Sequence, residues 1–114
     1  MGVTSWAKGV PSTSLFLSVI TVLELETGIL LLERKDKAQA SVLLSWLESC
    51  VLTGFEGRIL PVDIEVARLH VPNRLAYRDA LIAATALVHD LIVVTRNIMD
   101  FEPAGVKILN PWSA

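Results

Sequence analysis

The chain has one cysteine, no basic excess and no apolar run long enough to cross a membrane. The single cysteine, Cys50, excludes an intrachain disulfide framework and favours a reducing, cytoplasmic setting. The longest apolar stretches, Leu15–Leu25 and Ala80–Val88, contain polar breaks and fall short of the roughly 20 residues of a spanning helix. The opening residues do not match a secretory signal. We therefore expect a cytoplasmic protein without a membrane partner.

Charge alone does not identify a function. Ten lysine and arginine residues stand against twelve aspartate and glutamate residues, which gives a net charge of -2. A nucleic-acid-binding protein usually has a basic excess, which this chain lacks. An enzyme that touches only a few phosphates needs no more than a local basic patch, and metal ions can neutralise the remaining charge. The hydrophobic content of 53% is high, and it indicates that apolar surface is left for a partner.

The 114 residues predict one domain, 1–114, without repeats or a linker. Apolar runs and helical periodicity alternate along it. We expect strands at Leu15–Ser18, Arg58–Val62, Leu91–Val94 and Val106–Leu109. We expect helices at Thr21–Leu32 and Ala38–Leu52, a short one that is capped by Asp63 and runs through Leu69, and one at Asp79–His89. This order predicts a three-layer α/β fold, with a mostly parallel sheet flanked by helices and ligands beyond the carboxyl ends of the strands.

Two of these elements carry finer expectations. The run Leu91–Val94 is continuously apolar, which is typical of a strand buried on both faces in a parallel sheet. Cys50 falls at helical spacing with Leu47 in the second helix, so we expect it to be a small core residue.

Two carboxylates, Glu24 and Asp79, stand near expected helix starts in very apolar surroundings. A parallel sheet that brings them together would create a site for a divalent cation. Each also has a purely structural interpretation. Thr21 and Glu24 fit a capping box, with Thr21 as N-cap and Glu24 at the third helical position. Asp79 could simply stabilise the positive end of its helix.

The whole set of motifs resembles the PIN-domain family, in particular the VapC-type toxins of bacterial toxin–antitoxin systems. The segments that carry the resemblance occur in the family's order along nearly the whole chain. They are LFLSVITVLEL at Leu15–Leu25 with Gly28, GRILPVD at Gly57–Asp63, DALIAATA at Asp79–Ala86, VTRN at Val94–Asn97, Asp100 with Phe101, and LNPW at Leu109–Trp112.

The resemblance implies a metal-dependent endoribonuclease, in which acidic residues hold one or two Mg²⁺ or Mn²⁺ ions and the metal activates water against an RNA phosphodiester. It implies an antitoxin partner, an RNA substrate and a homodimer. Glu24 and Asp79 match the family's metal-binding acids. The family commonly has Asp or Asn in the turn where this chain has Asn97, and Asp100 is the nearby carboxylate. We rank Asn97 slightly ahead of Asp100, because Asp100 could instead cap the turn.

Three arginines flank the acidic positions and could hold RNA phosphates. They are Arg74, Arg78 and Arg96. Solvated or ion-paired arginines are an equally good interpretation of all three.

The chain departs from the family pattern at its beginning. Family members begin with a buried strand that ends in an aspartate, whereas Met1–Ser14 contains no Asp or Glu. We therefore expect an N-terminally truncated version of the fold, with weakened catalysis. The alternative function is that of a catalytically impaired PIN-like homologue that acts only as a protein-binding module.

Overall fold

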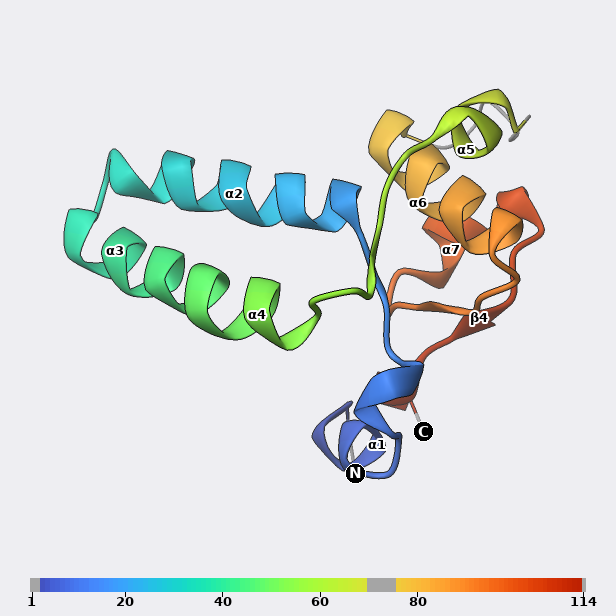
Figure 1. Cartoon of the computed structure of the whole chain (residues 1–114), viewed down its shortest axis with the longest axis horizontal. Coiled ribbons are helices and arrows are strands. Elements are labelled where there is room, and N and C mark those ends of the chain that lie inside the picture. Colours follow the sequence, from blue (N-terminus) through green and yellow to red (C-terminus); the bar gives the residue numbers. More distant parts are fainter. Residues whose placement is uncertain (1–2, 70–75, 114) are drawn as a thin grey trace. The chain divides into compact units, whose positions relative to one another are not determined.

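The chain forms two compact units in the computed structural model, which describes residues 3–69 and 76–113 (Figure 1). Residues 15–60 form one unit, called here the hairpin unit. Residues before and after this segment form the second unit, called here the helix–strand unit. Across the residues that the structure describes, no helix has both the length and the apolar character needed to cross a bilayer.

The hairpin unit consists mainly of two helices joined by a short turn. Its elements are β1 (Leu17–Ser18), α2 (Val19–Glu33), α3 (Lys37–Trp46), the π-helical turn η2 (Leu47–Val51), α4 (Leu52–Gly54) and β2 (Ile59–Leu60). Figure 1 shows α2 packed along α3 and its continuation through α4. Strands β1 and β2 pair in parallel, with Leu17 opposite Ile59 and Ser18 opposite Leu60. The parallel direction of this pair agrees with the mostly parallel strands predicted from the sequence, which did not indicate which strands would pair.

Helix α2 begins three residues earlier than the sequence suggested. Ser18 is the N-cap: its buried side-chain Oγ accepts a hydrogen bond from the backbone N–H of Ile20 at 3.0 Å. The predicted cap at Thr21 is therefore wrong. The reason is that Ser18 already supplies the capping oxygen at the end of β1, so the strand passes directly into the helix. Glu24 consequently lies in the second turn of α2 and takes no part in a capping box.

The core of the hairpin unit is built from Ile29 on α2 and from Ala40, Leu47 and Val51 on the facing segment. The buried positions 40, 47 and 51 define the inner stripe, and Cys50 falls outside it. Cys50 is exposed, so its expected place in the core is wrong. The π-helical turn at Leu47–Val51 widens the helix here and changes which side chains face inward.

Arg58 fastens the two ends of the hairpin unit together. Its Nη1 donates to the carbonyl oxygen of Leu15 at 2.7 Å, and its Nη2 donates to the carbonyl oxygen of Gly54. Its guanidinium lies over the ring of Phe55, 5.0 Å from the centroid. The Arg58 carbonyl in turn accepts from the backbone N–H of Leu17 at 3.0 Å. Arg58 thus fixes the strand pair from which α2 emerges.

The helix–strand unit contains the remaining elements. They are α1 (Val3–Lys8), η1 (Ser12–Ser14), α5 (Ile64–Arg68), α6 (Tyr77–Val88), β3 (Val93–Val94), α7 (Ile98–Phe101), η3 (Glu102–Ala104), β4 (Ile108–Leu109) and η4 (Pro111–Ser113). The predicted cap of α5 is confirmed, because Asp63 Oδ1 accepts from the backbone N–H of Val66 at 3.0 Å. The expected loop at 71–74 lies outside the described residues.

Strands β3 and β4 pair in parallel, with Val93 opposite Ile108 and Val94 opposite Leu109. Val93 is buried, but Val94 is 39% exposed, so the expectation of burial on both faces is wrong. The apolar sequence of this strand could not show whether both of its faces or only one of them would be buried. The parallel pairing of short strands between helices agrees with the α/β, PIN-like fold class predicted from the sequence.

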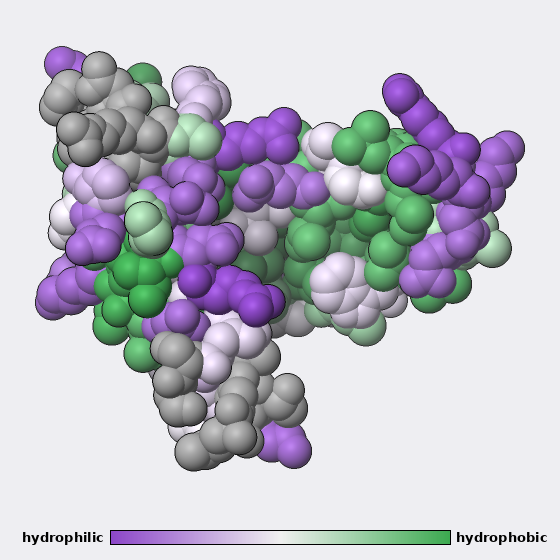
Figure 2. Space-filling view, turned by 180° about the vertical axis from the view of Figure 1, so that it is seen from behind, coloured by the Kyte–Doolittle hydropathy of each residue, from purple (hydrophilic) through white to green (hydrophobic). Residues whose placement is uncertain are grey.

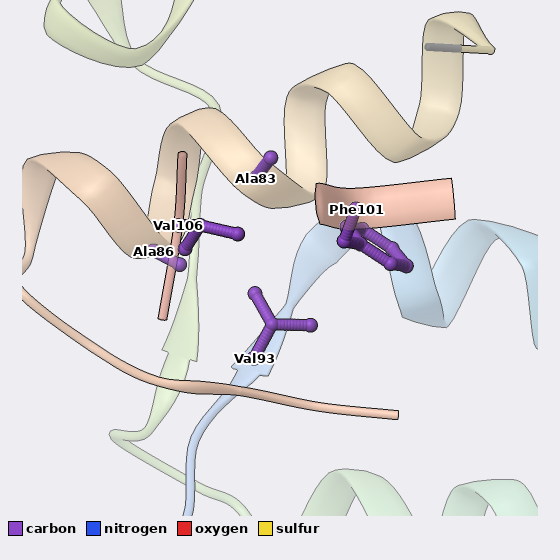
Figure 3. Close-up of a cluster of buried hydrophobic side chains, with 5 residues drawn as sticks. All are labelled: Ala83, Ala86, Val93, Phe101 and Val106. Carbon is purple, nitrogen blue, oxygen red and sulfur yellow. The ribbon is translucent and has the colours of Figure 1, made fainter. Parts of the chain in front are cut away.

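A single apolar cluster forms the core of the helix–strand unit. Figure 3 shows its five buried side chains converging from α6, β3, α7 and the segment before β4. They are Ala83, Ala86, Val93, Phe101 and Val106. The small alanine side chains let the axis of α6 come close to the strand pair. This packing fixes the positions of the acidic residues described next.

Candidate functional site

Asp79 lies in the first turn of α6, which begins at Tyr77. It is partly buried, and it stands one helical turn before Ala83 on the same side of the helix. Ala83 is fully buried in the apolar cluster. The side of α6 that carries Asp79 is therefore the side that packs inward. The packing of α6 thus sets the position of the Asp79 carboxylate in its first turn.

Asp100 lies in the first turn of α7 and is exposed. The next residue, Phe101, is buried in the same cluster as Ala83, and α6 packs against α7. This packing brings the two carboxylates into electrostatic contact. Burial raises the pKa of the Asp79 carboxyl above its ordinary value, and the negative charge of Asp100 raises that pKa further.

Asn97 occupies the turn between β3 and α7. Its backbone N–H donates to Thr95 Oγ1 at 3.0 Å, and its carbonyl accepts from the backbone N–H of Asp100 at 3.1 Å. Asn97 is the N-cap residue of α7, although its side chain makes no capping hydrogen bond. The turn therefore orients Asp100. Asp100 adds a negative charge that acts on Asp79, whereas Asn97 is neutral, so the choice between the two as a site residue stays a prediction.

Glu24 belongs to the hairpin unit. Its side chain is exposed, and it borders an open groove of about 240 Å³ between α2 and α3. The other residues that line this groove are Leu25, Gly28, Ile29, Leu43 and Trp46. Because Ser18 caps α2, the structural interpretation of Glu24 as half of a capping box no longer applies. Its convergence with Asp79 stays a prediction, since the two residues belong to different units.

The three flanking arginines have different surroundings. Arg78 is exposed in the first turn of α6, next to Asp79. Arg96 is exposed after β3, and its guanidinium carbon lies 5.7 Å from the ring centroid of Trp112. Arg74 lies outside the described residues. Contacts of Arg78 and Arg96 with RNA phosphates stay predictions.

The acidic side chains suit a divalent cation in part. Carboxylate oxygens are the ligands that Mg²⁺ and Mn²⁺ prefer, and a cation would offset the repulsion between Asp79 and Asp100. Within residues 3–69 and 76–113, no group of three or more His, Cys, Asp or Glu side chains lies close enough together to hold a metal. The Asp79–Asp100 pair thus offers two of the ligands that such a site needs.

Comparison of the chain with known proteins shows its family. Residues 4–102 match the PIN domain family. The chain belongs to the PIN domain family. It is 40% identical over 120 residues to a protein named Toxin FitB from Neisseria gonorrhoeae, with 96% of this chain and 84% of that protein covered. It is 33% identical over 119 residues to VapC ribonuclease Y4jK from Sinorhizobium fredii, with 96% and 84% covered.

The same relationship appears in three dimensions. The crystal structure of FitAcB from Neisseria gonorrhoeae superposes with a TM-score of 0.89 at 36% identity, covering 97% of this chain and 85% of that one. The resemblance to VapC-type PIN toxins predicted from the sequence is confirmed.

Two features of this edge of the helix–strand unit were not apparent in the sequence. The first is the pairing of Asp79 with Asp100, which depends on how Phe101 packs. The second is the stacking of Arg96 with Trp112, which are separated by 15 residues and meet only because β3 and β4 are parallel. The motif LNPW at Leu109–Trp112 was recognised in the sequence, but it did not indicate which side chain Trp112 would contact.

Proposed function

We propose that this protein is the toxin of a toxin–antitoxin pair and that it cleaves RNA phosphodiester bonds with a divalent cation. The observation that carries the proposal is the Asp79–Asp100 pair, two carboxylates held together by apolar packing in a PIN domain. The names of the relatives support it, since one is called a toxin and another a VapC ribonuclease.

Each acidic residue has a defined part in this proposal. Asp79 and Asp100 would hold Mg²⁺ or Mn²⁺ in the helix–strand unit, and Glu24, predicted from the sequence as a metal ligand, is tested separately by substitution. Asn97 keeps the turn that aims Asp100. The bound cation would lower the pKa of a water molecule and offset the charge that develops on the phosphate. Arg78 and Arg96 bind neighbouring phosphates of the RNA chain.

Cleavage of single-stranded RNA tests the proposal directly. Wild-type protein should cleave in Mg²⁺ or Mn²⁺ and stop cleaving in EDTA. Asp79→Asn and Asp100→Asn should each reduce the rate at least about a hundredfold, the usual loss when a group that acts on the reacting atoms is removed.

Matched controls separate chemistry from folding. Asp63→Asn makes the same change at the cap of α5, where Asn caps almost as well as Asp, and should leave the rate unchanged. Glu33→Gln at the far end of α2 is the control for Glu24→Gln. Cleavage that resists EDTA, or that Asp79→Asn and Asp63→Asn affect equally, would refute the proposed chemistry.

The partner in the proposal is a small antitoxin that covers the apolar surface of the hairpin unit. Leu30 and Leu31 on α2 are 59% and 56% exposed, and Val42 on α3 is also exposed. Figure 2 shows the hydrophobic surface that these helices present. Large apolar side chains that stay exposed on neighbouring helices are typical of a protein interface. A second copy of the chain is the other possible occupant, and light scattering of the purified protein decides whether it self-associates.

A second function has its own support. The same apolar surface would serve a PIN-like module that binds a partner without cleaving RNA. Among the described residues, no group of three or more His, Cys, Asp or Glu side chains could hold a metal ion. This module would capture its antitoxin normally while showing no cation-dependent cleavage. The cleavage assay above distinguishes the two functions.

A further inference from the structure

The carboxyl ends of β3 and β4 carry an exposed pair of side chains, of which the second, a tryptophan, has no part in the function proposed above. Arg96 follows β3, and Trp112 follows β4. The guanidinium carbon of Arg96 lies 5.7 Å from the centroid of the Trp112 ring, within the range of a cation–π contact. Trp112 nevertheless remains 41% exposed, so a large aromatic side chain at this edge stays open to a ligand.

The backbone around the pair is well fixed. The N–H of Thr95 donates to the carbonyl of Leu109 at 3.0 Å, which extends the strand pairing up to the residue before Arg96. Asn110 Oδ1 accepts from the backbone N–H of Trp112 at 2.9 Å, and Pro111 between them is almost fully buried. The backbone of Trp112 is therefore held in place, which lowers the entropy cost of using this side chain for binding.

The pair also lies at the edge that carries the acidic site. Asn97 is the next residue after Arg96, and its carbonyl accepts from the backbone N–H of Asp100. Helix α7, which carries Asp100, packs against β4, which leads to Trp112. In open parallel sheets, ligands bind beyond the carboxyl ends of the strands.

We propose that Trp112, positioned by Arg96, stacks against one unpaired base of the RNA substrate next to the acidic site. The inference rests on the proposed ribonuclease function and adds a substrate requirement to it, namely a single-stranded nucleotide at that position. Stacking suits this role because every base has a flat face, whereas a paired base inside a duplex does not expose it. The Arg96 guanidinium adds a positive charge for the adjacent phosphate.

Binding of a short single-stranded RNA, measured in an Asp79→Asn background that blocks cleavage, tests the inference. Trp112→Leu should weaken binding about 5- to 150-fold, the range that base stacking on one aromatic side chain covers. Trp112→Phe, which keeps an aromatic face, should retain most of the affinity. Trp46→Leu is the matched control, because Trp46 is similarly exposed, at 44%, and belongs to the hairpin unit.

Arg96 gives an independent readout. Arg96→Gln should flatten the dependence of affinity on salt by about 0.7 in the log–log slope, the value for one phosphate contact of a single strand. Arg96→Lys should keep that slope, since it keeps the charge, while it loses the planar stack on the indole.

An abasic scan locates the base. Removing one base at a time from the RNA should reveal one position at which the loss of affinity is large, and Trp112→Leu should abolish that position's effect.

In a protein whose other tryptophans, Trp6 and Trp46, are changed to Phe, single-stranded RNA should quench the fluorescence of Trp112 and a duplex should not. The quenching measurement decides the question even if Trp112→Leu fails to fold.

Several outcomes would overturn the inference. Equal RNA binding by Trp112→Leu and Trp46→Leu is one, and absence of quenching is another. A third is a Trp112→Leu variant that binds RNA normally but no longer binds its antitoxin. This result would mean that Trp112 contacts a protein and not RNA. Failure of the ribonuclease proposal itself looks different, because wild-type protein would then neither cleave RNA with Mn²⁺ nor bind it.

Discussion

The carboxylate of Asp100 lies close enough to that of Asp79 to raise the Asp79 pKa, although the two residues stand on different helices. Burial raises this pKa more than Asp100 does. The positive end of α6 would favour the ionised form of Asp79. Burial and the neighbouring negative charge outweigh that effect, so the pKa of Asp79 is raised.

Changing Asp100 should therefore alter the pH dependence of the Asp79 carboxyl. Removing the neighbouring charge with Asp100→Asn should lower the Asp79 pKa toward its ordinary value. A carbon-13 NMR titration of the aspartate side chains in EDTA measures this pKa without requiring activity. Asp90→Asn, a charge removal elsewhere in the same unit, is the control and should leave the Asp79 pKa in place. An Asp79 pKa that Asp100→Asn does not lower would mean that the two carboxylates do not interact.

The raised pKa also predicts how the metal-free protein depends on pH. Because the pKa of Asp79 is higher in the folded than in the unfolded state, the folded state binds this proton more tightly. The contribution to stability is complete below the unfolded-state pKa and is lost as the pH rises through the folded-state pKa. In EDTA at neutral pH, Asp79→Asn should therefore raise the melting temperature, and its advantage should shrink as the pH is lowered.

Thermal unfolding monitored by circular dichroism gives the comparison. Asp90→Asn again serves as the control, because Asp90 has a positive φ of 54°, which Asn also tolerates. A lower melting temperature for Asp79→Asn at neutral pH in EDTA would show that the carboxylate is structural.

The position of the α2 cap leads to a prediction about stability. Ser18→Ala should destabilise the protein by about 1 kcal/mol, since it leaves the N–H of Ile20 without its side-chain acceptor. Thr21→Ala should have a smaller effect, because Thr21 lies inside the helix. Urea unfolding of both variants measures the difference. The opposite order would restore Thr21 as the cap and Glu24 as its capping-box partner.

Arg58 should not be replaceable by lysine. Lysine keeps the charge, but it cannot donate to two carbonyl groups in a fixed fork while stacking on Phe55. We expect Arg58→Lys to reduce the free energy of unfolding by about 1–2 kcal/mol. Arg34→Lys, at an exposed position after α2, is the control. If both variants unfold at the same urea concentration, the Arg58 contacts contribute nothing to stability.

Local signals in the sequence predicted much of the fold. Asp63 was recognised as a cap because the capping oxygen and the following short helix are neighbours in the chain. The longer helices and the four strands were found from their periodicity, with boundaries displaced by a few residues, whereas the short helix α7 was not predicted. The exposed side chain of Cys50 was missed because a π-helical turn breaks the regular spacing on which the prediction relied.

The candidate site was harder to predict, because its residues meet through tertiary packing. Asp79 was recognised from its place at the head of the alanine-rich helix. The electrostatic interaction of Asp100 with Asp79 was not predicted, since nothing in the local sequence shows that Phe101 is buried beside α6. The ranking of Asn97 ahead of Asp100 stays a prediction. Trp112 was seen only as part of a motif, and its contact with Arg96 follows from the pairing of β3 with β4.

Direct measurement of Mn²⁺ binding tests the central claim that Asp79 and Asp100 hold a divalent cation, together with the sequence-based prediction that Glu24 is a metal ligand. Electron paramagnetic resonance of free Mn²⁺ gives both stoichiometry and affinity. The account predicts one tightly bound ion per chain. Asp79→Asn, Asp100→Asn and Glu24→Gln should each weaken binding more than about tenfold, since even outer-sphere changes have effects of that size. Asp63→Asn and Glu33→Gln should bind as the wild type does. Equal Mn²⁺ affinity in all five variants would contradict the account.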